Sequence, residues 1–167
     1  MWSMIVDYMR GYSERLAVVK VLLENGFCIK DDRIYCNEVE IATVSVARIA
    51  KVNRRTVSET ISMINKDEKL KEIFSYIRSA GLSLKEAAKY LDLGVIEITP
   101  TDPRTVGILA KAASLIVEQG LSIRQALVDD PELFPEPKLT LIVGGEIPGE
   151  LVTKFLEING VDKVSIY

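Results

Sequence analysis

Residues 45–61 read SVARIAKVNRRTVSETI. The apolar residues of this stretch recur at the spacing of two short helices, which meet at a polar corner formed by Val52 and Asn53. The second helix begins with Arg54 and Arg55 and carries hydroxyl side chains on faces away from its apolar stripe. The stretch therefore predicts two helices that cross at a tight turn, as in a helix-turn-helix. The residues expected to face inward are Val46, Ile49, Ala50, Val57, Ile61 and Ile64.

The charge of this segment suits a surface that binds nucleic acid. Residues 45–66 contain five basic residues and one acidic residue, Glu59, which gives a net charge of +4. A positive charge is what a surface that binds DNA phosphates requires. In a DNA-binding helix-turn-helix the second helix lies in the major groove, where arginine and hydroxyl side chains contact bases and phosphates. The competing interpretation is a solvated basic helix in a module for protein contacts. The candidate DNA-binding residues are Arg48, Lys51, Asn53, Arg54, Arg55, Thr56, Ser58 and Glu59.

The composition is that of a folded protein without a membrane span. The chain has 167 residues, of which 48% are hydrophobic and 27% are charged, enough for two small domains or one ordinary one. Apolar runs such as residues 139–145 are far shorter than the roughly 18 residues that cross a bilayer. No basic segment followed by an apolar core opens the sequence. We therefore expect a cytoplasmic protein that does not bind membranes.

Charge divides the chain into two parts. Residues 1–92 contain 15 Lys and Arg against 13 Asp and Glu, a net charge of +2. Residues 93–167 contain 6 against 11, a net charge of −5. We therefore predict a helix-turn-helix domain with linker helices over residues 1–92 and a second domain with a different partner over residues 93–167.

Catalytic chemistry has little support in the sequence. The chain has no histidine, and its two cysteines, Cys28 and Cys36, flank a predicted hairpin with its turn at Asp31 and Asp32. Two thiols alone make a poor metal site, and a reducing cytosol argues against a disulfide. No nucleophile–base pair or paired-carboxylate motif stands out. We expect no metal, no cofactor and no enzymatic activity.

The other elements of residues 1–92 are mainly helical. A helix capped by Ser13 is expected to end at Asn25 and Gly26. Residues 39–41 fit either a short strand or the first turn of a helix. Helices are predicted over residues 67–79 and, from a capping box, over residues 83–91. An apolar-faced helix in residues 1–12 packs either on its own domain or on a partner subunit.

Beyond Gly94 strands alternate with helices. Strands are predicted over residues 95–99, 121–128, 138–143 and 161–167, and helices over residues 105–119 and 148–158. The order β-α-β-β-α-β predicts a ferredoxin-like fold, in which both helices cover one face of a four-stranded antiparallel sheet. The chain as a whole is therefore assigned to the α+β class.

A family resemblance adds to this interpretation. The segment GILAKAA at residues 107–113, followed by EQGLSI at residues 118–123, resembles the ACT domain, a family that senses small ligands and most often amino acids. The family signature places Asp-x-Pro-Gly at the positions that residues 104–107 occupy here, and Gly107 matches it. An N-terminal helix-turn-helix with a C-terminal ACT domain resembles the archaeal predicted regulators of amino-acid metabolism.

The strand-to-helix junction is the candidate ligand site. Free N–H groups near Val106 and Gly107, at the positive end of a helix, favour a carboxylate. Arg104 can pair with a carboxylate and Asp102 with an ammonium group, which would engage both ends of an amino acid. The competing interpretation is ordinary helix capping by Asp102 or Thr105. The candidate ligand-binding residues are Asp102, Arg104, Thr105, Val106, Gly107, Ile108, Leu109, Ser122, Arg124 and Gln125.

These features lead to two hypotheses. The first is a ligand-responsive transcriptional regulator, a homodimer or higher homo-oligomer joined through exposed sheet edges, in which a bound amino acid changes the separation of two recognition helices. The second is a non-catalytic regulatory subunit that binds an amino-acid biosynthetic enzyme through its helical half.

Overall fold

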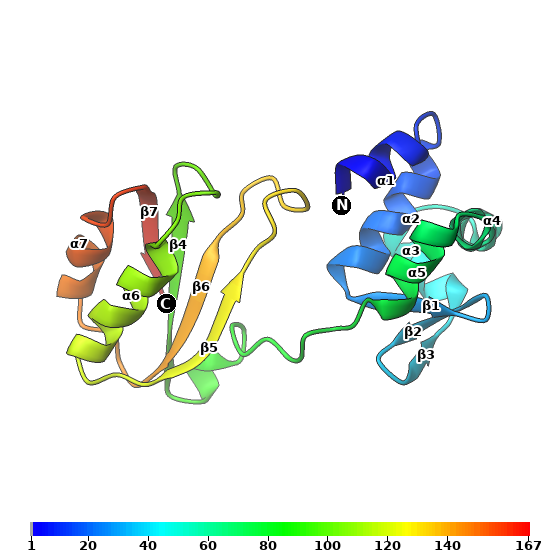
Figure 1. The fold of residues 1–167 in the computed structure, drawn as a ribbon. Coiled ribbons are helices and arrows are strands. Elements are labelled where there is room, and N and C mark those ends of the chain that lie inside the picture. Colours follow the sequence, from blue (N-terminus) through cyan, green and yellow to red (C-terminus); the bar gives the residue numbers. More distant parts are fainter. Residues whose placement is uncertain (1) are drawn as a thin grey trace. The chain divides into compact units, whose positions relative to one another are not determined.

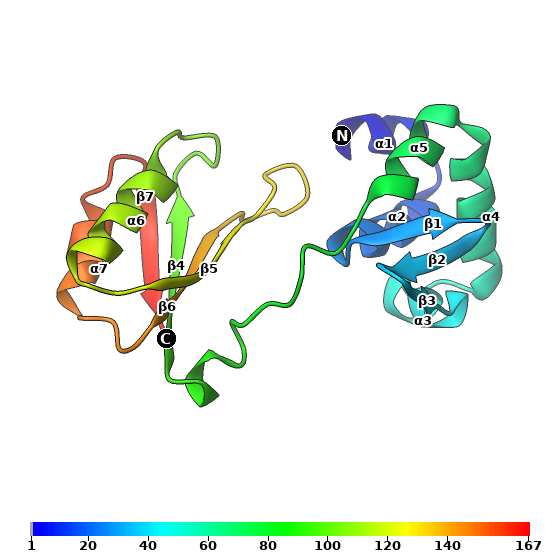
Figure 2. The ribbon, with the colours of Figure 1, turned by 60° about the horizontal axis from the view of Figure 1, so that its bottom comes forward.

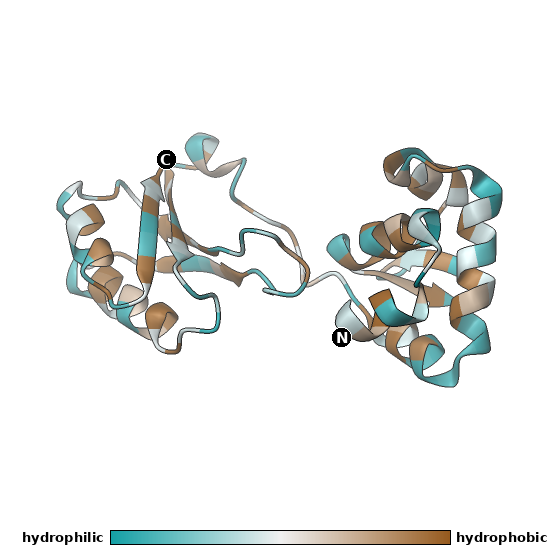
Figure 3. Ribbon diagram, turned by 90° about the horizontal axis from the view of Figure 1, so that it is seen from above, coloured by the Kyte–Doolittle hydropathy of each residue, from teal (hydrophilic) through white to brown (hydrophobic). Residues whose placement is uncertain are grey.

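The computed structural model describes residues 2–167, so Met1 of the predicted first domain lies outside the described residues. The chain forms two compact units, one up to Gly81 and the other from Leu82 onward (Figure 1). Both units combine helices with an antiparallel sheet, as the α+β assignment predicts. Hydrophobic and hydrophilic residues alternate along the helices of each unit (Figure 3).

Within residues 2–81, the first unit contains five helices and a three-stranded antiparallel sheet of order β1-β2-β3. The segment for which strand and helix were both open, Val39–Ile41, is a strand that pairs with β2. The elements are α1 (Trp2–Tyr8), α2 (Ser13–Glu24), β1 (Phe27–Lys30), β2 (Arg33–Cys36), β3 (Val39–Ile41), α3 (Thr43–Ala50), α4 (Arg54–Lys66) and α5 (Glu68–Tyr76).

The hairpin between β1 and β2 follows the sequence prediction. Asp31 and Asp32 both have positive φ, +48° and +60°, as a two-residue turn between twisted strands requires. In the register, Phe27 pairs with Cys36 and residue 28 with residue 35. The two cysteines therefore point to opposite faces of the hairpin, and both are free thiols.

The N-terminal segment packs within its own unit. Ile5 and Met9 are almost fully buried, and the Tyr8 hydroxyl lies 3.4 Å from the Met63 carbonyl oxygen in α4. The predicted cap of α2 is wrong, because Ser13 is the first helical residue and the capping position falls to Tyr12, whose side chain makes no capping bond.

The second unit has the predicted order of strands and helices. Its sheet has the antiparallel order β5-β6-β4-β7, and both helices cover the same face (Figures 1 and 2). The elements are β4 (Leu93–Pro100), α6 (Ile108–Glu118), β5 (Ile123–Val128), β6 (Leu139–Gly144), α7 (Glu150–Leu156) and β7 (Val161–Ile166).

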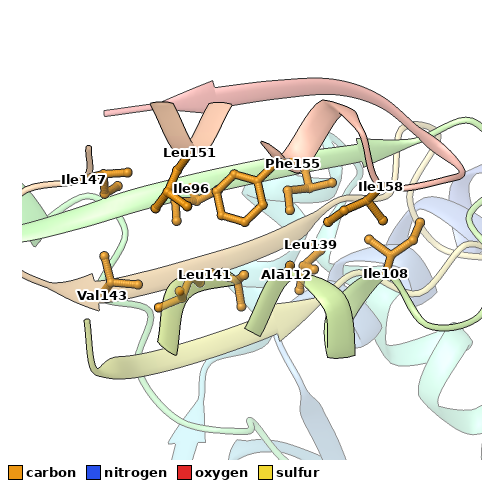
Figure 4. Close-up of a cluster of buried hydrophobic side chains, with 12 residues drawn as sticks. Ile96, Ile108, Ala112, Leu139, Leu141, Val143, Ile147, Leu151, Phe155 and Ile158 are labelled. Atoms are coloured by element: carbon orange, nitrogen blue, oxygen red, sulfur yellow. The ribbon is translucent and has the colours of Figure 1, made fainter. Parts of the chain in front are cut away.

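The core of the second unit lies between this sheet and its helices (Figure 4). Alternate residues of β4 and β6 point to the helices, and Phe155 of α7 is fully buried among them. The buried members of the cluster are Ile96, Ile98, Ile108, Ala112, Ile116, Leu139, Leu141, Val143, Ile147, Leu151, Phe155 and Ile158.

The boundary between the units differs from the predicted one after Asp92. The segment from Leu82 to Asp92 belongs to the second unit, where Gln125 accepts a bond from the Leu84 N–H at 2.9 Å and donates to the Leu82 carbonyl at 2.6 Å. Its only helical part is a short 3₁₀ turn, Ala88–Tyr90, and Ala88 packs on the sheet. Bonds to a distant strand fix this segment in the second unit. The local capping signal therefore misplaced the helix, and the change in net charge after Asp92 does not mark the boundary between the units.

Across residues 2–167, none of the helices is both long enough and apolar enough to cross a membrane.

Candidate DNA-binding surface and ligand pocket

The corner between α3 and α4 is built by local backbone chemistry. Lys51 adopts the left-handed conformation, φ 56° and ψ 41°, which ends α3. The Val52 N–H then bonds to the Ala47 carbonyl oxygen at 3.0 Å. Asn53 caps α4 by accepting a bond from the Thr56 N–H at 2.8 Å. These bonds fix the direction in which the N-terminus of α4 points.

One inward residue of the prediction faces solvent. Val46, Val57, Ile61 and Ile64 are buried as expected, but Ile49 is 66% exposed. The short helix α3 packs through the side that carries residues 46, 47 and 50, and position 49 lies off that side.

Cationic side chains surround the N-terminus of α4. Arg48, Lys51 and Arg54 are exposed, and none forms a salt bridge with another residue of the described chain. Arg55 is 87% exposed at its side chain, and its Nε lies 2.8 Å from Glu59 Oε1. Ser58 is also exposed. A basic surface is therefore present where the sequence predicts it.

Three predicted DNA-binding residues have other roles in the fold. Thr56 is 7% exposed, and its hydroxyl lies 3.1 Å from Glu14 Oε2, so the expectation that it faces outward is wrong. It lies on the buried side of α4 with Val57 and Thr60. The Asn53 side chain serves as the helix cap, and Glu59 accepts bonds from two arginines.

Sequence reasoning missed Arg15 of α2, the second arginine on Glu59. Its Nη2 lies 3.2 Å from Glu59 Oε2. The two residues are 44 positions apart, and no local pattern links them.

In the second unit the two residues predicted to pair with the charged ends of the ligand bond to each other. The Arg104 backbone N–H and Nε lie 3.0 and 3.2 Å from Asp102 Oδ1. The backbone bond and then the side-chain bond lower the pKa of Asp102 below its ordinary value. Both residues are exposed. The structure thus shows Asp102 and Arg104 as a local turn pair. The helix-capping interpretation is also wrong, because α6 is preceded by Gly107 and no side chain caps it.

A pocket of about 210 Å³ opens at the N-terminus of α6. It contains four predicted residues, Thr105, Gly107, Ile108 and Leu109. Asp102, Arg104 and Val106 do not line it, and Val106 is 92% exposed. Sequence reasoning missed the rest of the wall, which is formed by Pro100, Pro103, Val128, Asp129, Pro137, Lys138 and Leu139.

The predicted residues of β5 lie away from this pocket. In the register of β5 with β6, Val128 pairs with Leu139 at the pocket, whereas Ile123 pairs with Val143 at the other end. Ser122, Arg124 and Gln125 therefore lie at the far end of the strand. Gln125 is held by the backbone of Leu82 and Leu84 and is not available to a ligand in the pocket.

The face of the sheet opposite the helices carries a buried carboxylate, Glu97, which is 6% exposed. Lys85 Nζ lies 2.7 Å from Oε1, and the Tyr167 hydroxyl lies 3.1 Å from Oε2. Burial opposes ionisation of Glu97, but the bonds from Lys85 and Tyr167 and the charges of Lys85 and Lys138 outweigh it and lower its pKa. Glu97 is thus an ionised anchor for the segment that carries Lys85.

This anchor predicts acid sensitivity of the second unit. Because folding lowers the pKa of Glu97, its ionised form contributes stability above the ordinary value of 4.5, and this stability is lost as the pH falls through the folded-state pKa. Urea unfolding gives the free energy of unfolding at neutral pH and at about pH 3. The decrease in this free energy on acidification should be smaller for Glu97→Gln than for the unsubstituted protein. The exposed Glu118→Gln is the control, and an equal loss in all three proteins would contradict the prediction.

Among residues 2–167, no group of three or more His, Cys, Asp and Glu side chains is placed to hold a metal ion.

No protein-family model matches the sequence, and no curated protein matches it. A crystal structure of the leucine response regulatory protein LrpA of Mycobacterium tuberculosis is similar over 93% of this chain and 90% of that chain. The two sequences are 14% identical and the TM-score is 0.28.

Proposed function

We propose that the chain is a transcription regulator that binds DNA through α3 and α4 and responds to a small ligand bound by its second unit. The observation that carries the proposal is the cluster of exposed cations at the N-terminus of α4, three of which lack an ion-pair partner within residues 2–167. Such a surface, on a helix that follows a tight turn, suits the major groove of DNA.

The exposed cations divide into two groups by position. Arg54 and Arg55 are the first two residues of α4, where side chains of a recognition helix reach base edges. Arg48 and Lys51 belong to α3 and to the turn, from which they would contact phosphates. The positive end of the α4 dipole adds to their attraction for the DNA backbone.

Specific DNA binding is expected to depend on Arg55. Arg55→Ala should weaken binding to a duplex selected by the unsubstituted protein by about 10- to 100-fold, since one bidentate base contact is worth about 1–3 kcal/mol. Fluorescence anisotropy at several salt concentrations measures both affinity and the number of phosphate contacts. Arg10→Ala removes an exposed arginine paired with Asp7 and is the control. A salt slope near zero for the unsubstituted protein would contradict DNA binding.

The ligand proposed for the pocket at α6 is an amino acid. The backbone N–H groups at the start of this helix would donate hydrogen bonds to the carboxylate, and Asp129 supplies an acidic group for the ammonium. The apolar residues of the wall, Ile108, Val128 and Leu139, would contact an apolar side chain. The resemblance of residues 107–113 to the ACT domain supports this choice.

Ligand binding is expected to stabilise the protein. In a thermal-shift screen of the twenty amino acids, a ligand present at about 100 times its dissociation constant should raise the free energy of unfolding by about 2.7 kcal/mol. Asp129→Asn should remove the shift, whereas Asp102→Asn, outside the pocket, should retain it. A flat response across the panel would contradict the amino-acid proposal without affecting DNA binding.

Homodimerisation would connect the two activities. The sheet of the second unit ends in β5 and β7, and unpaired strand edges of this kind invite pairing with a second copy. A two-fold protein reads two half-sites about one helical turn apart. By linkage, ligand and DNA would alter each other's affinity equally, typically by about 1–3 kcal/mol.

A regulatory subunit that binds an enzyme is the second candidate. Apolar residues of the first unit favour it, because Val39, Val44 and Ile49 are between half and two-thirds exposed. Ile49 also lines a groove of about 400 Å³ beside α2 and β3. Capture of a biosynthetic enzyme in a pull-down, together with no DNA binding, would favour this candidate.

A further inference from the structure

Arg55 and Arg15 share one carboxylate in the first unit. Arg55 Nε lies 2.8 Å from Glu59 Oε1, and Arg15 Nη2 lies 3.2 Å from Glu59 Oε2. Each oxygen of Glu59 thus faces a different arginine. Because the two bonds come from α4 and from α2, they restrict the carboxylate from both sides.

Arg15 is itself fixed by its surroundings. Its side chain is 24% exposed, against 87% for Arg55. Its guanidinium lies over the Tyr12 ring, 4.5 Å from the centroid, and its Nη1 lies 3.2 Å from Met63 Sδ. A third bond between the same helices joins the Thr56 hydroxyl to Glu14. Arg15 therefore provides a half-buried support behind a largely exposed arginine.

We propose that Arg15 and Glu59 are positioning residues that present the two terminal nitrogens of Arg55 to a guanine in the major groove. The bond to Glu59 uses Nε, and no described residue accepts a bond from Nη1 or Nη2 of Arg55. A bidentate contact needs two donors aimed at guanine O6 and N7, and the terminal nitrogens can supply them. This inference rests on the proposed DNA-binding function.

The charge of Glu59 favours a base over a phosphate as the target of Arg55. A carboxylate beside the guanidinium repels a phosphate, whereas the guanine edge is uncharged and presents acceptors. Arg54 has no acidic partner within the described residues and keeps its full attraction for the DNA backbone. Prior orientation of Arg55 also reduces the side-chain entropy lost on binding.

The test compares base preference with general affinity. Duplexes are selected by the unsubstituted protein from a randomised pool, and the G·C pair that Arg55 contacts is identified by loss of its preference in Arg55→Ala. That pair is then replaced by A·T. The unsubstituted protein should prefer the G·C duplex by about tenfold. Arg15→Met and Glu59→Ala should reduce this preference several-fold while the salt slope stays unchanged or steepens.

Two comparisons separate positioning from a general structural effect. Arg15→Lys, which keeps the charge, should restore part of the preference, and the exposed Arg10→Met should leave it unchanged. In the free protein, NMR should show faster solvent exchange of the Arg55 Nε–H in Arg15→Met than in the unsubstituted protein, since Glu59 would be held less firmly. Thermal denaturation checks that each variant folds.

The outcomes distinguish this inference from the proposed function. DNA binding with an unchanged G·C preference in Arg15→Met overturns the role of Arg15 and leaves the function intact. If the selected duplexes contain no guanine whose preference is lost in Arg55→Ala, the proposal that Arg55 contacts a guanine is overturned. No DNA binding by the unsubstituted protein overturns the function and the inference together.

Discussion

Replacement of Phe155 by alanine is expected to lower the free energy of unfolding of the second unit by about 3–5 kcal/mol. The side chain is fully buried, and it lies between the sheet and α7 in the centre of the cluster in Figure 4. Its removal sacrifices apolar contact area and leaves a cavity that the sheet and α7 cannot fill without moving.

The neighbouring Leu156 provides a matched control on the same helix, because 47% of it is exposed. Leu156→Ala should change the stability by much less, within about 0.5 kcal/mol. Calorimetry of the full chain measures both variants and follows the transition that the Phe155 substitution shifts. Equal losses in the free energy of unfolding for the two variants would contradict the prediction that the buried Phe155 contributes more to the core than the half-exposed Leu156.

Replacement of Gly26 by alanine should destabilise the first unit by two separate effects. Gly26 has φ +63°, and alanine in this left-handed conformation costs about 1–2 kcal/mol. A Cβ at this position would also lie 2.7 Å from the backbone N and Cα of Ser79. Because backbone atoms cannot turn aside as a flexible side chain can, relief of this contact should cost about a further 1–3 kcal/mol.

Gly11 isolates the first effect. Its φ is +86°, but a Cβ there would meet nothing within 4 Å. Gly11→Ala should therefore show only the conformational cost of about 1–2 kcal/mol. Urea unfolding followed by the fluorescence of Trp2 compares the two variants. Equal losses in the free energy of unfolding for Gly11→Ala and Gly26→Ala would contradict this prediction. They would mean that contact with the segment after α5 adds nothing to the requirement for glycine at position 26.

Local sequence signals determined the elements near which the candidate sites lie. Apolar spacing and the polar corner at Val52 and Asn53 identified α3, α4 and the turn between them, since a helix period involves only neighbouring residues. The pair Asp31 and Asp32 identified the first hairpin for the same reason. The order of strands and helices after Gly94 was also readable from local periodicity.

Local signals failed where a distant residue decides the outcome. Ile49 fits a helical stripe, yet the side of α3 that packs is set by α2 and α4. Position 56 offers a hydroxyl near the start of a basic helix, but its bond to Glu14 turns it inward. Ser122, Arg124 and Gln125 were expected beside the ligand, but they lie at the end of β5 away from the pocket, and Gln125 bonds to the backbone of residues 82 and 84 instead.

The sequence by itself determined that this protein has a basic helix after a tight corner and a βαββαβ unit, because periodicity and capping act over a few residues. Only the tertiary structure decided which cations are free, which acid holds Arg55, and which side chains enclose the pocket at α6. Arg15 meets Glu59 across 44 positions, and Lys138 reaches the pocket from the segment before β6. Such contacts depend on how the elements pack, and that packing is a property of the whole unit.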